Sequence, residues 1–204
     1  MSLKQKQSLT TNRNLSLAFI PLAVGINLGI GFLVQVLKLP IFVDSVGTII
    51  ATVLLGWRVG AVVGVLGFII TSLTIFPPAI YFSGTQICIA LYTHLLGKRG
   101  GFKTIPKTIF TGIGLAILAA LVSAPVIYFL FGGVTGNGIS VFTIYLQNSG
   151  FTKAQSVLFS GITAEIIDKT AQCLLAFFLL KSIPKFLLEK FKGGSLIENN
   201  FVGS

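Results

Sequence analysis

The sequence predicts an all-α membrane protein, a compact bundle of six transmembrane helices with a long extracellular loop between helices 5 and 6. Of its 204 residues, 53% are hydrophobic and only 10% are charged, whereas a soluble domain usually carries about 25% charged residues. Its mean hydropathy is +0.93. Apolar runs of about 20 residues, the length that crosses a bilayer, recur along the chain. We therefore expect a cytoplasmic N-terminal segment (1–14), a membrane domain (15–192) and a disordered polar tail (193–204).

The first predicted span covers residues 15–37 and carries a stripe of small side chains. Gly25 and Gly29 form a G-x-x-x-G pair, and Ala18 lies nearby. Small residues at this spacing let a second helix approach closely. The stripe is therefore either a docking face for a partner subunit or an internal packing face, and the sequence leaves both open.

The second span is predicted over Val46–Leu55, after a helix break at residues 38–40. Asp44 and Ser45 precede it, and side-chain oxygens at this position typically cap the free backbone N–H groups of a helix start. The third span is predicted over residues 60–76 and has a second stripe of small residues, which we interpret as a packing face. The stripe consists of Gly56, Gly60, Gly64 and Gly67.

The fourth and fifth spans are predicted over residues 80–96 and 108–131, and the sixth over residues 155–180. The longest connection, residues 132–154, joins the last two of these spans. It begins with several glycines and continues with aromatic and apolar residues. Long loops in compact domains are usually functional lids or disordered segments. The apolar content favours a packed lid.

Positive charge gathers on one side of the six predicted spans. With both termini in the cytoplasm, most lysines and arginines lie on the cytoplasmic side, as the positive-inside rule requires. These residues are Lys4, Lys6, Arg13, Arg58, Lys98, Arg99, Lys103, Lys107, Lys181, Lys185, Lys190 and Lys192. We therefore assign the net charge of +10 to membrane topology rather than to nucleic-acid binding. The expected location is the plasma membrane, with several passes and both termini cytoplasmic.

The sixth predicted span carries a charged face in an otherwise apolar helix. Glu165, Asp168, Lys169 and Gln172 are offset by three, four and seven residues, which places them on one narrow side of a helix. Charges inside a membrane are costly and normally face a protein interior or a water-filled cavity. Glu165 and Lys169 form an i,i+4 pair in the favourable order. The face is either a buried pair that keeps helices in register or a substrate site.

Other polar residues are candidate neighbours of this charged face. They are Asp44, Tyr81, Ser83, Gln86, Tyr145, Gln147 and Asn148. The sequence contains no phosphate-binding loop and no H-E-x-x-H or C-x-x-C motif, and His94 is its single histidine. Cys88 and Cys173 lie in apolar runs and are interpreted as small buried hydrophobic residues. We therefore expect no enzyme activity, no metal site and no cofactor in this chain.

Four short stretches, spread over most of the chain, carry a family resemblance. They are K-L-P-I-F-V-D-S-V-G-T (38–48), G-W-R-V-G-A-V-V-G (56–64), F-G-G-V-T-G-N-G (131–138) and E-I-I-D-K-T followed by I-P-K (165–170 and 183–185). Together with six short helices and a basic cytoplasmic rim, they resemble the substrate-binding S-components of energy-coupling factor (ECF) transporters. The resemblance implies capture of a vitamin or related micronutrient from outside. It also implies docking on a transmembrane coupling subunit, which sits on two cytoplasmic ATPases that use the ATP, and toppling in the membrane to release the solute.

The resemblance implies roles for individual residues as well. By that pattern the cap over the site contains Asp44 and Ser45, and the site is built from Gln86, Tyr145, Asn148, Asp168, Lys169 and Gln172. Glu165 and Ser83, taken from the charged face and its neighbours, complete the expected substrate-binding residues. Family members often dock through an A-x-x-x-A pair in the first helix. Here Ala18 and Ala23 are five residues apart, so the docking role falls to Gly25 and Gly29. Small heterocycles, such as pyridoxine-like, thiamine-precursor or queuine-like compounds, suit a site with both carboxylate and ammonium groups.

Two other functions remain open from the sequence, a membrane sensor module and an ion-coupled solute carrier. Sensor modules also use five or six short helices. A carrier needs titratable groups that lead to both membrane faces, whereas this sequence shows one charged layer, in the sixth predicted span.

Overall fold

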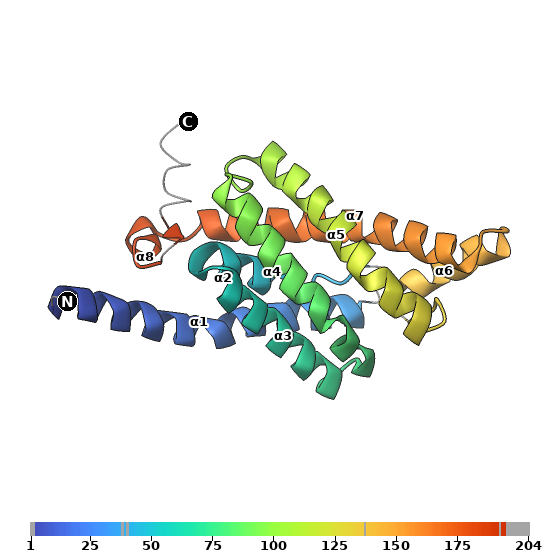
Figure 1. The fold of residues 1–204 in the computed structure, drawn as a ribbon, viewed down its shortest axis with the longest axis horizontal. Helices are drawn as coiled ribbons and strands as arrows, with labels where there is room; N and C mark the ends of the chain where they lie inside the picture. The colour runs from blue at the N-terminus through green and yellow to red at the C-terminus, as the bar shows by residue number, and fades with distance from the viewer. Residues whose placement is uncertain (1–2, 38, 40, 137, 192, 195–204) are drawn as a thin grey trace.

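The computed structural model describes residues 3–37, 39, 41–136, 138–191 and 193–194, with side chains described from residue 17 onward except at residue 35. Every regular element in these residues is a helix, as predicted. The helices are α1 (Leu3–Val36), α2 (Val46–Leu55), α3 (Trp57–Thr74), the 3-10 helix η1 (Pro77–Phe82), α4 (Ser83–Lys98), α5 (Ile105–Leu130), α6 (Gly138–Asn148), α7 (Lys153–Lys181) and α8 (Lys185–Leu188). Figure 1 shows the start of α1 and α8 at one end of the molecule and α6 at the other.

Four segments are long and apolar enough to cross a membrane, which confirms the prediction of membrane-spanning helices. They are Leu17–Val34, Trp57–Thr74, Pro77–Lys98 and Ile105–Leu130. The outer surface of the bundle is apolar too, since Leu73, Phe110 and Phe129 each expose more than 70% of their surface. Such exposure suits contact with lipid better than contact with water.

The other two predicted spans differ from these four. Helix α2 is too short, because ten residues rise only about 15 Å, half of the hydrocarbon thickness of about 30 Å. Helix α7 is long enough, with 29 residues and a length of about 44 Å, but it carries three charged residues near its middle. By length and composition, the described residues thus contain four membrane-spanning helices, one short apolar helix and one long charged helix, and the six-span count stays a prediction.

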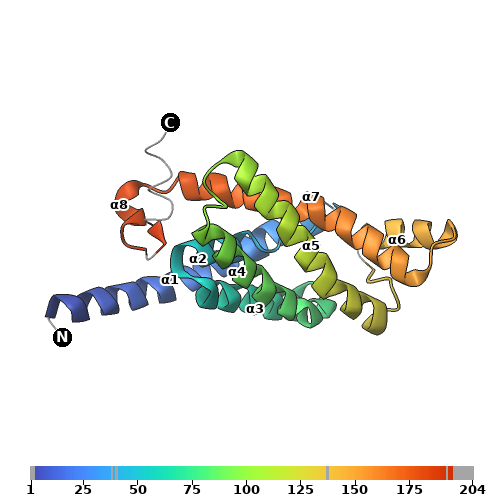
Figure 2. The same ribbon diagram turned by 45° about the horizontal axis from the view of Figure 1, so that its top comes forward.

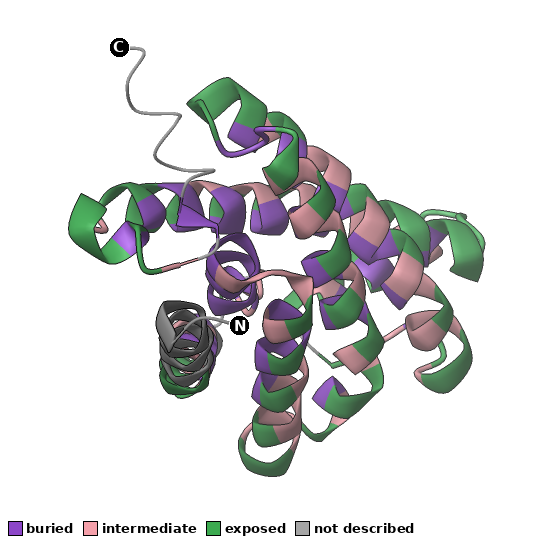
Figure 3. Cartoon of the chain, turned by 60° about the vertical axis from the view of Figure 1, so that its left-hand side comes forward, coloured by how far each residue is buried: buried purple, intermediate pink, exposed green. Residues whose placement is uncertain are grey.

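Helix α2 lies at the centre of the bundle, in contact with α1, α3, α4 and α7. All of its residues except Leu55 are buried. Its apolar side chains share a core with Ile89 of α4, Leu115 of α5 and Phe177 of α7. A helix that is apolar all round is typical of a buried core element. Figure 3 shows this arrangement, with buried residues on inward-facing surfaces and exposed residues on the outer ones.

Helix α7 runs along the longest dimension of the molecule and packs against α5, α2 and α6 (Figures 1 and 2). It begins with a capping box, in which the Thr152 and Gln155 side chains each accept a hydrogen bond from the other residue's backbone N–H. On α5, Gly112 allows close approach, because a Cβ there would lie 2.7 Å from the Cα of Thr170. Thus α7 is held from several sides, which fixes its polar residues in place.

The predicted long loop between the last two spans contains helix α6. Gly132 and Gly133 have φ angles of 63° and 101°, which side chains other than glycine rarely adopt. They turn the chain after α5, so α6 folds back along the first part of α7 (Figure 2). The Thr143 and Ser160 hydroxyls lie 2.8 Å apart and join the two helices. The periodicity of a single short helix was hidden by the glycines that precede it.

The structure describes part of each chain end. Helix α1 begins at Leu3, within the predicted N-terminal segment 1–14. In the predicted tail 193–204, residues 195–204 lie outside the described residues. Gly193 is buried, and its N–H donates to the Leu54 carbonyl at 2.9 Å. The start of the predicted tail is therefore packed on α2.

Candidate functional site

The charged face predicted on α7 is buried inside the bundle. Glu165 exposes 7% of its surface and Lys169 2%, while Asp168 and Gln172 expose none. All four lie near the segment that precedes α2, residues 41–45, which we call the 41–45 loop. Burying an unpaired charge is strongly unfavourable, so these groups require partners.

Lys169 lies among three carboxylates. Its Nζ is 2.7 Å from Asp168 Oδ2, 3.2 Å from Asp44 Oδ1 and 3.5 Å from Glu165 Oε2. The predicted i,i+4 pair between Glu165 and Lys169 is present, but it is the longest of the three contacts. The cluster contains three acidic side chains for one basic side chain.

Asp168 and Gln172 bind the backbone of the 41–45 loop. Asp168 Oδ1 accepts hydrogen bonds from the N–H groups of Phe42, at 2.9 Å, and Val43, at 2.8 Å. Gln172 Oε1 accepts a hydrogen bond from the Ser45 N–H at 2.8 Å, and Gln172 Nε2 donates to Asp168 Oδ2 at 2.7 Å. Together they form a latch that fixes the loop on α7.

Val43 shows that this latch holds the backbone in an unusual conformation. Its φ angle is +45°, and a β-branched residue in this region is a conformational outlier. Such strain costs about 1–3 kcal/mol and persists only where the surroundings impose it. Here the two N–H groups that converge on Asp168 Oδ1 form the kind of concave donor pair that binds anions. The carboxylate of Asp168 occupies that position.

A chain of hydrogen bonds continues from the latch to α1. The Ser45 hydroxyl donates to Asp44 Oδ1 at 2.7 Å and accepts from Gln86 Nε2 at 2.8 Å. Gln86 Oε1 accepts from the Thr48 hydroxyl at 2.9 Å, and Thr48 Oγ1 accepts from Asn27 Nδ2 at 3.0 Å. Helices α1, α2, α4 and α7 are therefore joined by one buried polar network.

The predicted capping role of Asp44 and Ser45 is not observed. Ser45 precedes the first residue of α2, but its side chain makes no cap hydrogen bond. Its hydroxyl is engaged in the network instead, and Asn27 Oδ1 accepts the free N–H of Gly47 at 2.7 Å. A residue from another helix thus caps α2, which sequence spacing does not reveal.

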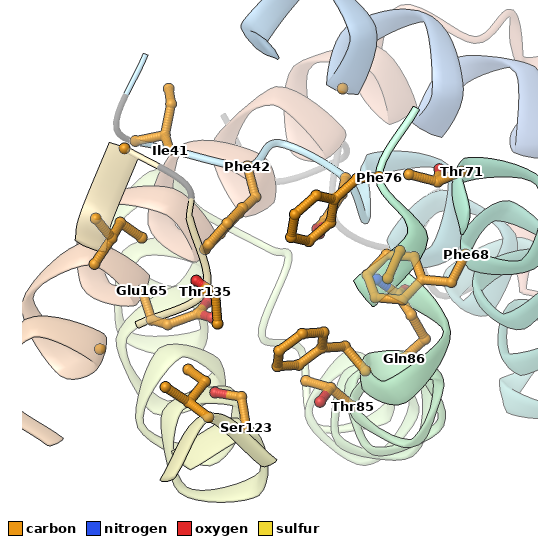
Figure 4. Close-up of a pocket in the computed structure, with 18 of the residues that line it drawn as sticks. Ile41, Phe42, Phe68, Thr71, Phe76, Thr85, Gln86, Ser123, Thr135 and Glu165 are labelled. Atoms are coloured by element: carbon orange, nitrogen blue, oxygen red, sulfur yellow. The ribbon is translucent and has the colours of Figure 1, made fainter. Parts of the chain in front are cut away.

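A cavity of about 560 Å³ adjoins this network. Its charged lining residues are Asp44, Glu165 and Lys169. Figure 4 shows Glu165, Gln86, Phe42, Phe68 and Phe76 around the space. Most of the remaining wall is apolar, with isolated hydroxyl and amide groups. A mostly apolar pocket of this size with a few polar groups is typical of small-molecule sites.

The predicted site residues separate into groups. Asp44, Gln86, Glu165 and Lys169 line the cavity, whereas the polar groups of Asp168 and Gln172 bind the 41–45 loop behind it. The predicted residues absent from the cavity wall are Asp168, Gln172, Ser83, Tyr145 and Asn148.

Two of the predicted site residues that do not line the cavity lie on the outer side of α6. Tyr145 and Asn148 are exposed, while Ile139, Ser140 and Thr143 of the same helix line the cavity. Because the segment was expected to be a loop, its inner and outer faces were not distinguished.

Asn27 and Thr48 are site residues that the sequence reasoning missed. Asn27 is 4% exposed, lines the cavity and lies in the middle of an apolar span. An amide at such a position is a costly polar group that needs a partner. An asparagine within the first apolar span was the signal that could have identified this site residue. Its hydrogen-bond partner on α2, Thr48, is known only from the fold.

The two glycine stripes have different surroundings. A Cβ on Gly64 would lie 2.6 Å from Gln86 Oε1, and one on Gly60 would contact the Thr52 side chain, so this part of α3 is the predicted packing face. Gly25 and Gly29 have nothing within 4 Å of a Cβ position, and Ala18 is exposed. The α1 stripe therefore packs on no described part of this chain.

The site is characterised by its charges and its cavity rather than by metal ligands. Within the described ranges, no group of three or more histidine, cysteine or acidic residues is arranged to hold a metal ion. No known protein family, curated protein or solved structure matches the chain. Its function must therefore be inferred from the site itself.

Proposed function

We propose that this chain is the substrate-binding S-component of an ECF-type, ATP-driven importer. It captures a small vitamin or related heterocyclic micronutrient from outside the cell. It then delivers the solute by toppling on a transmembrane coupling subunit, which two cytoplasmic ATPases drive. This proposal combines the cavity and its charges with the resemblance of the sequence to that family.

The observation that carries the proposal is the cavity of about 560 Å³ with Asp44, Glu165 and Lys169 in its wall. A buried ion pair that only joins helices needs no empty space beside it. Charged groups within membrane-spanning bundles are costly, and they commonly mark substrate or ion pathways. The volume suits a molecule of vitamin size.

The 41–45 loop could open to let a solute enter the cavity. Residues Ile41, Phe42 and Asp44 line the cavity, and the loop is held to α7 mainly through Asp168 and Gln172. A few hydrogen bonds can be broken and re-formed much more easily than a packed helix interface. We expect the loop to open for the solute and close over it.

The exposed stripe on α1 suits the docking step. Gly25, Gly29 and Ala18 leave a flat, exposed surface, and surfaces of this kind let a partner helix approach closely. The positive-inside rule places α8 and the basic connection between α4 and α5 in the cytoplasm of a plasma-membrane protein. Both termini are then cytoplasmic, and α6 lies outside.

The test is to purify the protein from its native host and to analyse bound small molecules by mass spectrometry. We expect one solute at a stoichiometry near one per chain, together with co-purifying ATPase subunits. Equilibrium binding of that solute to the purified chain should occur without turnover. No bound molecule, no binding to a vitamin panel and no ATPase partners would contradict the proposal. Uptake that an uncoupler abolishes while ATP stays high would indicate an ion-coupled carrier instead.

A further inference from the structure

We propose that the cavity takes a cationic ligand, with a protonated nitrogen against Glu165 and Asp44 and a flat unsaturated body among the phenylalanines. This inference rests on the proposed function, because it names the chemical class of the solute. Four observations support it: the balance of charge, the acceptor without a donor on Glu165, the occupation of both anion-binding features by the chain's own carboxylates, and the aromatic wall.

The charge balance of the cluster is negative. Asp44, Glu165 and Asp168 surround Lys169, which is the one basic residue in the described cavity wall. A second positive charge placed beside these groups would reduce their mutual repulsion. A ligand anion would add a fourth negative charge in a region of low dielectric constant, where like charges repel strongly.

Glu165 has an acceptor without a hydrogen-bond donor. Its Oε2 is buried and makes no hydrogen bond, although Lys169 Nζ lies 3.5 Å away. The residue is 7% exposed and lines the cavity. A buried acceptor without a donor is costly, and a cationic group of a ligand in the cavity beside the Glu165 carboxylate would offset that cost.

Both features that would attract an anion are already occupied. Lys169 Nζ donates to Asp168 Oδ2 and Asp44 Oδ1 and lies 3.5 Å from Glu165 Oε2, so its positive charge is already compensated by three carboxylates. The converging N–H groups of Phe42 and Val43 bind Asp168 Oδ1. The groups left for a charged ligand are therefore carboxylate oxygens.

The aromatic wall suits the same class of ligand. Phe42, Phe68, Phe76 and Phe82 line the cavity, and the three that Figure 4 labels come from the 41–45 loop, α3 and the connection to η1. Aromatic faces attract cations and stack on flat rings. An amidinium, a protonated aminopyrimidine or a similar planar cation combines both properties.

The test uses three fragments of nearly equal shape, benzamidine, benzamide and benzoate, which are cationic, neutral and anionic. Binding to the purified, solute-depleted protein is measured by titration calorimetry. We expect benzamidine to bind more tightly than benzamide, and benzoate to show no binding. Glu165→Gln should weaken benzamidine by about tenfold, the loss of one charged hydrogen bond, and leave benzamide unchanged.

Glu189→Gln is the matched control. It removes the same charge as Glu165→Gln, but from an exposed residue beyond the end of α8. It should leave benzamidine affinity unchanged. If Glu165→Gln does not fold, Asp44→Asn serves in its place, with the same expected loss.

Several results would overturn the inference. They are benzoate or benzamide binding at least as tightly as benzamidine, benzamidine binding unaffected by Glu165→Gln and Asp44→Asn, or no fragment binding at all. Each of these leaves the transport proposal to its own test, because a neutral or acidic co-purified solute would still identify a transporter. Absence of any co-purified or bound solute and of ATPase partners would instead contradict the transport proposal.

Discussion

Asp168 and Glu165 are both buried carboxylates on α7, three residues apart and beside the same lysine, yet their surroundings differ. Asp168 accepts hydrogen bonds from two backbone N–H groups, from Lys169 and from Gln172. Glu165 Oε2 accepts none and lies in an ion pair of 3.5 Å. Asp168 is turned to the 41–45 loop, and Glu165 to the cavity.

The difference separates a carboxylate whose hydrogen bonds are made within the chain from one that lacks a donor. A fully satisfied buried polar group stiffens the fold around it, whereas an unsatisfied one costs free energy until a partner arrives. Asp168 thus explains the position of the loop, and Glu165 explains why the cavity has a polar end.

The same contrast applies to the glycines of α3 and α1. Gly64 is used inside the chain, where a Cβ would collide with Gln86, while Gly25 faces open space. A substitution at a buried glycine is therefore expected to change the stability of the chain. A substitution at an open glycine is expected to change the binding of a partner.

The largest loss of stability is expected for Lys169→Ala. The change leaves Asp44, Glu165 and Asp168 without their counter-charge, and breaking a buried ion pair typically costs about 3–5 kcal/mol. Thermal unfolding in detergent should show a clear fall in midpoint. Lys185→Ala, at the exposed start of α8, should leave the midpoint unchanged. Equal midpoints for both variants would contradict the central role of Lys169.

Asp168→Asn should destabilise the protein by about 2–3 kcal/mol, because the charged acceptor of two backbone N–H groups is lost. The 41–45 loop should then open more often, which faster proteolytic cleavage near residue 43 would report. Glu165→Gln is the paired control and should change stability by less than about 1 kcal/mol. If the two variants unfolded at the same temperature, the distinction between these carboxylates would be wrong.

Gly64→Ala should cost about 1–3 kcal/mol, since the added methyl group overpacks the contact between α3 and α4. A Cβ there would lie 2.6 Å from Gln86 Oε1, so the hydrogen-bond network should be disturbed as well. Unfolding midpoints of Gly64→Ala and Gly25→Ala provide the comparison. A midpoint unchanged in Gly64→Ala would contradict the close packing of α3 on α4.

Gly25→Leu should have the smallest effect on the isolated protein, within about 0.5 kcal/mol, because the position is open. Solute binding should also be unchanged. Assembly with the coupling subunit, measured by co-purification, should be lost because a large side chain prevents close helix approach. Normal assembly of Gly25→Leu would show that docking uses another surface.

Most helices could be predicted from the sequence, and the errors in the prediction have physical causes. The bounds of α2 agree with the prediction, because charged, proline and glycine residues flank its apolar run. Helix α6 was missed because its 11 residues directly follow a glycine-rich stretch, which was interpreted as the start of a long loop. The sequence showed that α2 is apolar but not that it lies inside the bundle.

The polar cluster was predictable only along one helix. Spacing brings Glu165, Asp168, Lys169 and Gln172 together, since residues three and four apart are neighbours on a helix. The contact between Lys169 and Asp44 joins residues 125 positions apart, and no local pattern reveals it. For the same reason, the sequence did not distinguish the carboxylate that binds the loop from the one that faces the cavity.

The hydrogen bonds at Asp168 Oδ1 come from main-chain N–H groups, so the latch does not depend on which side chain residue 42 carries. The Phe42 side chain meanwhile forms part of the cavity wall. Attachment of the loop and the shape of the cavity are therefore separable at one residue. The wall can be reshaped by substitution at position 42 with the loop still fastened, and proline alone is forbidden because it lacks the N–H. Position 42 thus allows the cavity wall to vary in sequence while the latch is retained.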